Sequence, residues 1–421
     1  MTTEGVSIAG VGSTTCRFCG AVARTSFADL GMSPIANDYL SPEQLNGMEP
    51  FYPLRALVCP DCFLVQLQDF ETPEAIFADD YAYFSSYSTS WLDHCQRYVD
   101  YAIERFRIGS GSTVVEVASN DGYLLQFFAR RGVRVLGVEP AASVAQVAQV
   151  KGVPTVQRFF GVNTARDLLP DAQADLLIGN NVLAHVPDLN DFVAGMKVLL
   201  APQGVITMEF PHLQQLVDHV QFDTIYHEHF SYFSFLTVRR VFAAHGLELF
   251  DVDELPTHGG SLRIYARHAE SDHEPVTRRV TELVEREREA GYEDLEVYRT
   301  FAERVKATKR EVLRFFVDAK EQGASIAGYG APAKGNTLLN YCGIGPDMLD
   351  YTVDLSPHKQ GKFLPGTRIP IHAPEEIART RPDFVFILPW NLRDEIVEQM
   401  AHVREWGGRF VVRTPSFEVI E

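Results

Sequence analysis

Short apolar runs alternate with amphipathic stretches through the middle of the chain. The apolar runs lie at 113–117, 134–138, 175–179 and 205–210, and segments with helical periodicity separate them. This alternation predicts strands joined by helices, in the βαβ arrangement of a nucleotide-binding domain. Two further apolar stretches within 247–268 predict a β-hairpin that closes the same sheet.

The last third of the chain shows a second α/β pattern. Residues 273–322 are strongly charged and have helical periodicity, which predicts helices with a solvated, charged face. "ASIAGYGAPAKGNTLLNY" (324–341) then predicts a strand, a glycine-rich loop and a helix. Free backbone N–H groups beside a helix N-terminus form an anion site, to which Lys334 adds a positive charge. The candidate ligands are Gly330, Pro332, Lys334 and Asn336; an NAD site and a decayed domain kept for packing are the alternatives.

Four of the six cysteines form two C-x-x-C pairs, "CRFC" and "CPDC". Each pair directs two thiolates at one point, so Cys16, Cys19, Cys59 and Cys62 can complete a tetrahedron around zinc. Four thiolates leave no open position, so the predicted zinc is structural. Two redox or incidental pairs are the alternative, and the remaining two cysteines are expected to be ordinary buried thiols.

Bulk properties restrict the class of protein. A length of 421 residues indicates two or three domains, and an apolar content of 46% is enough for sizeable cores. The formal net charge of −18 repels phosphate backbones, so we expect no nucleic-acid partner. No apolar run reaches the ~18 residues of a membrane span, and the N-terminus lacks a secretory signal. We therefore expect a cytoplasmic protein without membrane contact.

The loop after the first central strand predicts a cofactor site. It is not the G-x-G-x-x-G of dinucleotide enzymes, since Ala118, Asn120 and Gly122 occupy the small-residue positions. Glu116 stands at the end of the first strand. Glu139 ends the second strand, where a carboxylate can accept both hydroxyls of an adenosine ribose. The strand in "ADLLIGNNVLAHVPD" adds three residues at its carboxyl end, Asn180, Asn181 and His185.

That segment, followed by "LLAPQGVITMEFP", resembles the later motifs of class I S-adenosylmethionine-dependent methyltransferases. A generic doubly wound domain for another adenosine cofactor is the alternative. With "DYAYFSSYSTSW", "YHEHFSYFS", "HGGSLRIY" and "GYGAPAKGNTLLNY", the chain resembles the sugar C-methyltransferase family of deoxysugar biosynthesis. Within that family it is most similar to the branch that methylates C-3′ in tetronitrose biosynthesis.

The resemblance implies an α/β protein of three domains. These are a zinc-binding N-terminal domain (1–75), a class I, Rossmann-like methyltransferase domain (76–270), and a helical linker with a C-terminal Rossmann-like domain (271–421). It implies S-adenosylmethionine as donor and a dTDP-4-keto-deoxysugar as acceptor, methylated at C3 through an enolate in antibiotic biosynthesis. The glycine-rich loop would then bind the diphosphate of the substrate. We expect a monomer.

The stretch Tyr226-His227-Glu228-His229 allows three interpretations. On a strand, His227 and His229 share one face and could bind a metal together with His212 or His185. The histidines could instead be satisfied inside a packed strand end. The resemblance favours the third interpretation, a proton-transfer site.

Under that interpretation, His229 removes the C3 proton, and Tyr226 or Glu228 holds the ketone or enolate. His185 binds the enolate oxygen or relays the proton, and Tyr81 opens a lid over the donor.

Two rival functions remain at this point. One is an O- or N-methyltransferase of the same fold, and the other is a non-catalytic scaffold.

Overall fold

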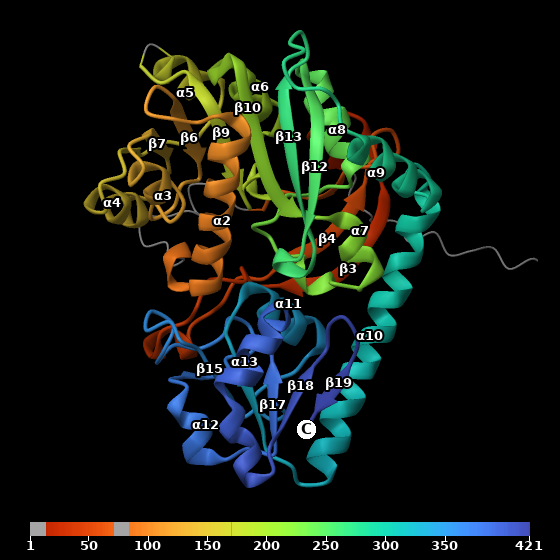
Figure 1. The fold of residues 1–421 in the computed structure, drawn as a ribbon. Helices are drawn as coiled ribbons and strands as arrows, with labels where there is room; N and C mark the ends of the chain where they lie inside the picture. Colours follow the sequence, from red (N-terminus) through yellow and green to blue (C-terminus); the bar gives the residue numbers. More distant parts are fainter. Residues whose placement is uncertain (1–13, 71–83, 170) are drawn as a thin grey trace, which may run out of the picture.

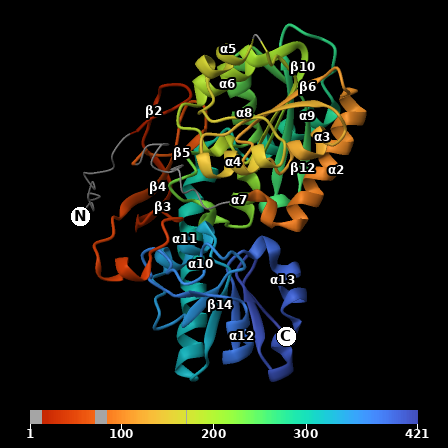
Figure 2. The same ribbon diagram turned by 90° about the vertical axis from the view of Figure 1, so that its left-hand side faces the viewer.

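The computed structural model describes residues 14–70, 84–169 and 171–421 (Figure 1). A seven-stranded sheet forms the upper part of Figure 1, and a six-stranded sheet forms the lower part. A four-stranded sheet near the N-terminus lies against the upper part, beside the top of the long helix α10, as Figure 2 also shows. No helix in the described ranges combines the length and apolar character that crossing a membrane requires.

The seven-stranded sheet has the order β12-β13-β10-β9-β6-β7-β8. The strands from β8 to β10 run parallel, and β13 lies antiparallel between β10 and β12. The four predicted central strands and the closing hairpin are therefore confirmed. The strands are β6 (Thr113–Val117), β7 (Arg134–Val138), β8 (Thr155–Val156), β9 (Ala174–Asn180), β10 (Leu200–Pro211), β12 (Leu247–Leu255) and β13 (Ser261–His268).

Helices cover both faces of this sheet because its central strands are apolar on both faces. Val114 and Leu176 pack into one core with residues of α2 and α3, whereas Val115 and Leu177 pack into another with residues of α6 and α8. The helices of this part are α2 (Thr89–Phe106), α3 (Leu125–Ala129), α4 (Ala142–Val150), α5 (Val162–Leu168), α6 (Leu189–Leu199), α7 (Leu213–Asp218) and α8 (Phe235–Ala244).

The N-terminal sheet includes a strand from the middle of the chain. Its order is β11-β5-β4-β3, and all neighbouring strands are antiparallel. β11 (Ser231–Tyr232) follows the YHEH stretch directly, so pairing with β5 ties that stretch to the N-terminal part. The other strands are β3 (Thr25–Ser33), β4 (Tyr52–Val58) and β5 (Val65–Leu67), with β1 (Thr14–Thr15) and β2 (Val22–Ala23) forming a separate pair.

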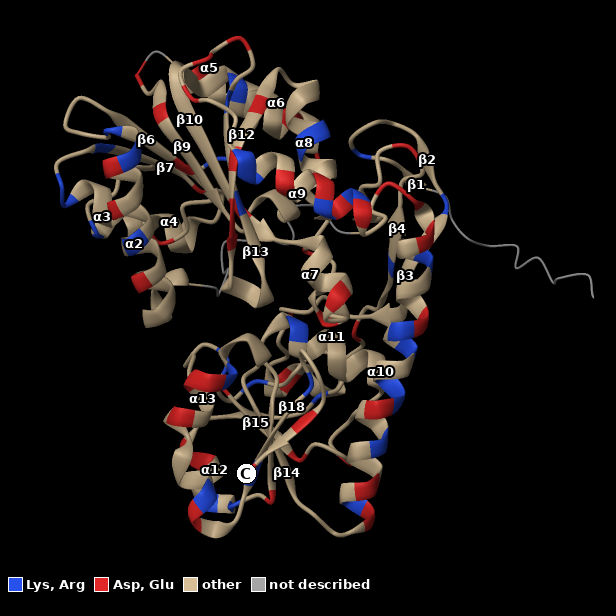
Figure 3. Cartoon of the chain, turned by 45° about the vertical axis from the view of Figure 1, so that its right-hand side comes forward, with Lys and Arg blue, Asp and Glu red and all other residues tan. Residues whose placement is uncertain are grey.

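Two charged helices connect the seven-stranded sheet to the C-terminal part. They are α9 (Arg278–Glu289) and α10 (Leu295–Glu321), and both carry residues of both charges along their outer surface: Arg and Glu on α9, and Lys, Arg, Asp and Glu on α10 (Figure 3). The inner face of α10 is apolar and packs on β3, where Phe301 stacks on Phe27 with ring centroids 4.4 Å apart. The predicted solvated helix face is confirmed.

The C-terminal sheet has the order β16-β15-β14-β17-β18-β19, and only β19 runs antiparallel to its neighbour. The predicted strand, glycine-rich loop and helix are present as β14 and α11. The elements are β14 (Ile326–Tyr329), α11 (Ala333–Cys342), β15 (Tyr351–Val353), β16 (Ile371–His372), α12 (Glu375–Thr380), β17 (Phe384–Ile387), α13 (Arg393–Gln399), β18 (Arg409–Val412) and β19 (Glu418–Ile420).

One local expectation is wrong. The YHEH stretch is a turn between the short helix η4 (Phe222–Thr224) and β11, so its residues do not alternate between the faces of a strand. The reason is a backbone bond within the stretch, in which the N–H of His229 donates to the carbonyl of Tyr226 at 2.9 Å. His227 and His229 are therefore directed to different surroundings.

Candidate active site

The loop that follows β6 is held in an unusual backbone conformation. Ala118, Asn120 and Gly122 have positive φ angles of 56°, 48° and 75°. The carboxylate of Glu139 fixes this shape, because it accepts the backbone N–H of Asn120 at 2.9 Å and that of Ala141 at 3.0 Å. Left-handed backbone at a non-glycine residue costs about 1–3 kcal/mol and is concentrated at ligand-binding sites. The loop and the carboxylate at the end of β7 therefore form one unit.

The protein does not supply hydrogen-bond partners for all the buried polar side-chain atoms around this loop. Buried side-chain atoms of Asp121 and Asn181 have no hydrogen-bond partner among the described residues, and the buried side chains of Glu116 and Asn180 lie beside the hydroxyl of Tyr123. Buried polar atoms without partners are costly and rare, so this set fits a polar ligand. Burial also raises the pKa of Glu116 well above its usual range. S-adenosylmethionine carries an ammonium group, a carboxylate and ribose hydroxyls, which are the partners that these atoms lack.

Asn180, Asn181 and His185 lie at and just beyond the carboxyl end of β9. Asn181 has a positive φ of 52°, and its side-chain amide lies 3.1 Å from Nε2 of His258. His258 stands in η5 (Thr257–Gly259), the turn between β12 and β13. Burial lowers the pKa of His258 to about 4, so the ring is neutral and Nε2 can accept the amide hydrogen. The sequence drew attention to "HGGSLRIY" but assigned this histidine no role.

Helix α2 adds two aromatic residues to which the sequence assigned no role, although Trp91 ends the quoted motif "DYAYFSSYSTSW". The ring of Trp91 lies 5.1 Å from that of His94 and 5.5 Å from that of His258, between centroids. Nε2 of His94 lies 2.9 Å from the carboxylate of Glu209, which Arg263 also binds. Burial opposes ionisation of Glu209, but the Arg263 guanidinium outweighs it and lowers the pKa of the carboxyl to about 2. The Glu209 carboxylate is therefore ionised, paired with Arg263, and in contact with His94 on this side of the site.

His229 is bound through both of its ring nitrogens. Nδ1 lies 2.9 Å from the carbonyl oxygen of Thr224, and Nε2 lies 2.7 Å from the hydroxyl of Tyr226. Because a carbonyl oxygen can only accept, Nδ1 carries the proton and Nε2 is left as the basic nitrogen. The ring of His185 packs edge-on against His229 with centroids 4.6 Å apart. An imidazole base, a phenol and a second imidazole thus meet at one point.

The histidines of this cluster are neutral at pH 7. Burial lowers the pKa of His229 well below its usual range, and the nearby His185 and Lys334 lower it further. Burial lowers the pKa of His185 to about 4. Each ring therefore has a nitrogen lone pair that can take up a proton.

Glu228 points from the same turn towards the N-terminal part. Its Oε1 accepts a hydrogen bond from the amide of Asn37 at 3.0 Å, and its buried Oε2 has no hydrogen-bond partner in the described chain. Burial raises the pKa of Glu228 to about 7, so the carboxyl can change its charge near neutral pH. Tyr81, the expected lid residue, lies outside the described residues.

A metal does not fit the YHEH stretch. Nε2 of His227 lies 3.3 Å from the carbonyl of Pro53, and Nε2 of His212 lies 2.6 Å from the carboxylate of Glu287. Neither imidazole joins His229. Within the described ranges, the four cysteines are the only group of three or more potential metal ligands whose ligand atoms lie close together.

The C-terminal domain contributes a charge to the cluster. Nζ of Lys334 donates to Oδ1 of Asn391 at 2.7 Å and lies 4.3 Å from the centroid of the Trp390 ring. Burial lowers the pKa of Lys334 to about 8, which leaves the ammonium largely charged at pH 7. Asn336, two residues later, instead faces the N-terminal part, where its amide donates to the carbonyl of Ala36 at 2.6 Å.

Two backbone N–H groups of the glycine-rich loop between β14 and α11 already have acceptors within the protein, and one of them is the N–H of Gly330, which donates to the carbonyl of Val353 at 2.6 Å. Gly330 has a φ of 85°, and Pro332 is the N-cap residue of α11. The N–H of Ala331 donates to the carboxylate of Asp354 at 2.7 Å. An anion at this helix terminus would therefore bind the N–H groups beyond Ala331, beside Lys334.

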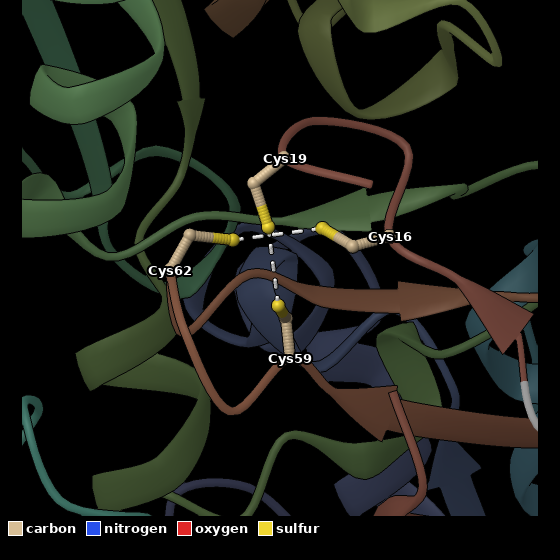
Figure 4. A group of neighbouring side chains, drawn as sticks. All are labelled: Cys16, Cys19, Cys59 and Cys62. Atoms are coloured by element: carbon tan, nitrogen blue, oxygen red, sulfur yellow. Dashed lines mark hydrogen bonds between the residues drawn. The ribbon is translucent and has the colours of Figure 1, made fainter. Parts of the chain in front are cut away.

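Cys16, Cys19, Cys59 and Cys62 converge as the sequence predicted (Figure 4). Their four sulfur atoms lie within 4.8 Å of one another, and the Cys16–Cys62 and Cys19–Cys59 pairs are each 3.5 Å apart. A zinc ion with Zn–S distances of about 2.3 Å needs sulfur atoms roughly 3.8 Å apart, so the cluster fits tetrahedral zinc. The four thiolates close the coordination sphere, which is the arrangement of a structural site.

Comparison with known proteins agrees with this geometry. The chain is 39% identical to the C-methyltransferase NovU of Streptomyces niveus over 409 residues, which cover 96% of each chain. The chain belongs to this C-methyltransferase family. Three family profiles match it, described as a zinc binding domain (residues 16–77), a methyltransferase domain (residues 91–252) and a C-methyltransferase C-terminal domain (residues 256–415).

Other similarities are shorter or weaker. The ubiquinone biosynthesis O-methyltransferase of Paramagnetospirillum magneticum is 32% identical over 96 residues, or 23% of this chain and 39% of that one. A solved structure of the Burkholderia thailandensis 1,6-didemethyltoxoflavin-N1-methyltransferase is 18% identical, with a TM-score of 0.37. That match covers 49% of this chain and 95% of the other. The family assignment rests on the NovU relationship and makes the protein an S-adenosylmethionine-dependent C-methyltransferase with a zinc-binding site of four cysteines.

Proposed function

We propose that this C-methyltransferase acts on C3 of a dTDP-4-keto-deoxysugar through an enolate, in deoxysugar and antibiotic biosynthesis. The observation that carries the proposal is the pair of hydrogen bonds on His229, which leaves Nε2 as a base in the buried cluster. Methylation of a carbon beside a ketone requires loss of a C–H proton, and a positioned imidazole suits that task. The sugar class and the C3 position come from the motif resemblance to the tetronitrose branch.

The side chains of the cluster divide the reaction between them. Nε2 of His229 accepts the C3 proton, while Thr224 keeps the proton on Nδ1. The hydroxyl of Tyr226, which rests on Nε2, is displaced by the substrate and donates to the ketone oxygen. Stabilising the enolate oxygen in this way contributes most to lowering the barrier. His185, in contact with His229, is placed to bind the same oxygen or to relay the proton.

The donor side has a separate task. When bound, S-adenosylmethionine supplies an electrophilic methyl group. Glu139 and the loop containing Asn120 would hold its ribose, since the carboxylate and the loop already form one unit. Glu116, Asn180 and Asn181 would bind its polar groups through their buried side-chain atoms.

The charge of the bound substrate would also change the pKa of His229. Lys334 is one of the groups that lower the pKa of His229. A diphosphate bound beside α11 would neutralise that ammonium. Neutralisation would raise the basicity of His229 only when a nucleotide sugar is in place, so proton removal would be coupled to substrate binding.

The test is to supply a panel of dTDP-4-keto-deoxysugars with 13C-methyl-labelled donor and to locate the new methyl group by NMR. We expect a methyl group on C3. His229→Asn keeps the approximate size but removes the basic nitrogen, so turnover should fall by ~10²–10⁴ with both ligands still bound. His402→Asn, whose ring contacts Trp406 in the C-terminal domain, is the matched control and should leave turnover unchanged.

Two results would contradict the proposal. A methyl group on oxygen or nitrogen would show that the acceptor chemistry is wrong. Near-normal turnover in His229→Asn would show that the base lies elsewhere, at Glu228 or His185.

A further inference from the structure

Trp390 connects the C-terminal domain to both sides of the site. It stands in η6 (Trp390–Leu392), just after β17, and only 6% of it is exposed. One face of the indole lies against Nζ of Lys334. Its outer edge is so close to the backbone of Gly259, in the turn that carries His258, that a Cβ there would lie 2.4 Å from the ring. The indole therefore touches the region of the expected diphosphate site and the hairpin turn at once.

The indole N–H reaches a third element. Nε1 of Trp390 donates to Oδ2 of Asp223 at 2.6 Å, and the carboxylate is fully buried. Oδ1 of Asp223 lies 3.7 Å from the guanidinium of Arg413, which also binds the carbonyl of Val220. Residues 220–224 are thus fixed by two side chains of the C-terminal domain.

Thr224, the residue after Asp223, binds the proposed base His229 through its backbone carbonyl. The carbonyl of Thr224 accepts the Nδ1 proton of His229. A continuous set of contacts therefore runs from the indole N–H of Trp390 through Asp223 and the η4 backbone to the imidazole. Orientation and tautomer of a histidine are set by the hydrogen bond that its other nitrogen makes. Moving the Thr224 carbonyl would release the Nδ1 proton and allow the Nε2–H tautomer, which is not a base at Nε2.

We infer that Trp390 is a positioning residue, whose indole N–H keeps Nε2 of His229 basic by fixing Asp223 and the carbonyl of Thr224. The inference rests on the proposed role of His229 and extends it to the C-terminal domain. The aromatic ring and the N–H have different tasks. The ring packs against Gly259 and Lys334, whereas the N–H acts on the base.

Two substitutions separate these tasks. Trp390→Phe keeps an aromatic ring but removes the N–H. Trp390→His removes the outer ring but places Nε2–H the same number of bonds from Cβ as the indole N–H. Trp406→Phe is the matched control, because Trp406 also donates its N–H within the C-terminal domain, to the carbonyl of Pro382 at 3.1 Å.

The first readout needs no substrate. Long-range 1H–15N spectra of 15N-histidine-labelled protein report the tautomer of each imidazole, and His229→Asn identifies the His229 signals by their loss. In the wild-type enzyme and in Trp406→Phe, we expect the Nδ1–H form. In Trp390→Phe, we expect a mixture containing the Nε2–H form. Trp390→His should restore the wild-type pattern.

The second readout is methylation of dTDP-4-keto-6-deoxyglucose as the probe sugar. Trp390→Phe should lower kcat about ten- to a hundredfold, the usual cost of a displaced catalytic group, with a smaller change in KM. Trp390→His should recover most of kcat but show a raised KM, because it loses the packing against Lys334. Trp406→Phe should match the wild type in both constants.

An unchanged His229 tautomer in Trp390→Phe would overturn the inference, whatever the probe sugar does. Equal losses of kcat in Trp390→Phe and Trp390→His, with a wild-type tautomer in both, would show that the ring only packs. If His229→Asn itself keeps near-normal turnover, the proposed base is wrong and the inference falls with it.

Discussion

Replacing Glu139 by Gln tests the donor site most directly. The carboxylate has about four lone-pair positions, and the N–H groups of Asn120 and Ala141 use two of them. Two positions therefore remain for the two ribose hydroxyls. Gln keeps the shape but removes the negative charge and one acceptor oxygen. A hydrogen bond to a charged group contributes about 1.5–3 kcal/mol, so the dissociation constant of S-adenosylmethionine should rise roughly 10- to 100-fold.

A pH series adds a signature that general damage to the fold would not produce. Burial raises the pKa of Glu139 to about 7, so in the ligand-free enzyme the carboxyl is protonated below that pH and charged above it. Ribose hydroxyls would stabilise the charged form and lower the pKa on binding. Donor affinity should therefore rise as the pH increases to about 7, then level off, and binding just below pH 7 should release a proton. Glu139→Gln should show neither effect.

Isothermal titration calorimetry in buffers of different ionisation enthalpy measures both the affinity and the released proton. Glu228→Gln is the matched control, since burial gives that carboxyl a similar pKa of about 7 on the acceptor side of the site. It should leave donor affinity and its pH dependence unchanged. Equal affinities for wild type and Glu139→Gln at every pH would refute the assignment of Glu139 to the ribose.

Three further outcomes are expected. Cys59→Ser should reduce zinc from about one ion per chain in elemental analysis and lower the free energy of unfolding, whereas Cys342→Ser, which lies outside the cluster, should retain the metal. If Glu228 acts as a carboxylate, kcat/KM of the wild-type enzyme should fall as the pH drops below about 7, because the carboxyl becomes protonated. In a pH–rate profile, Glu228→Gln should not show this decrease. Lys334→Met should raise KM for the nucleotide sugar roughly tenfold or more without changing donor affinity, whereas Lys309→Met, which removes the ammonium over Tyr341, should leave KM unchanged in steady-state assays.

Local patterns in the sequence were sufficient for the four central strands of the seven-stranded sheet and for the zinc ligands. The strand at 113–117 has valines on both faces, so its burial in a parallel sheet follows from the residues themselves. The two C-x-x-C pairs each form a local turn, and the converging thiolates follow from that geometry. The signal for each strand and each C-x-x-C turn lies within a few positions, although the cluster itself joins cysteines 40 and 46 positions apart.

The environment of the base depends on distant residues and could not be predicted. The YHEH stretch has the composition of a strand end, yet a backbone hydrogen bond within it forms a turn, and distant residues bind the side chains around that turn. Trp390 reaches Asp223 across 167 positions, and Asn37 reaches Glu228 across 191. Nothing in the sequence near 226–229 indicates these partners. The same holds for His258, whose turn carries a motif but whose contact with Asn181 spans 77 positions.

The turn that carries the base is held from two other parts of the chain. From the N-terminal part, Asn37 binds Glu228 and β5 pairs with β11; from the C-terminal part, Trp390 binds Asp223.

The zinc cluster lies beside β5, because Cys62 precedes that strand by only a few residues. Removal of zinc should therefore disturb the Asn37–Glu228 bond as well as global stability. Turnover should fall at a chelator concentration and temperature at which circular dichroism still reports a folded methyltransferase domain, whereas donor affinity, which depends on β6 and β7, should change later. A loss of donor affinity before turnover would show that zinc supports the whole fold and not the catalytic turn.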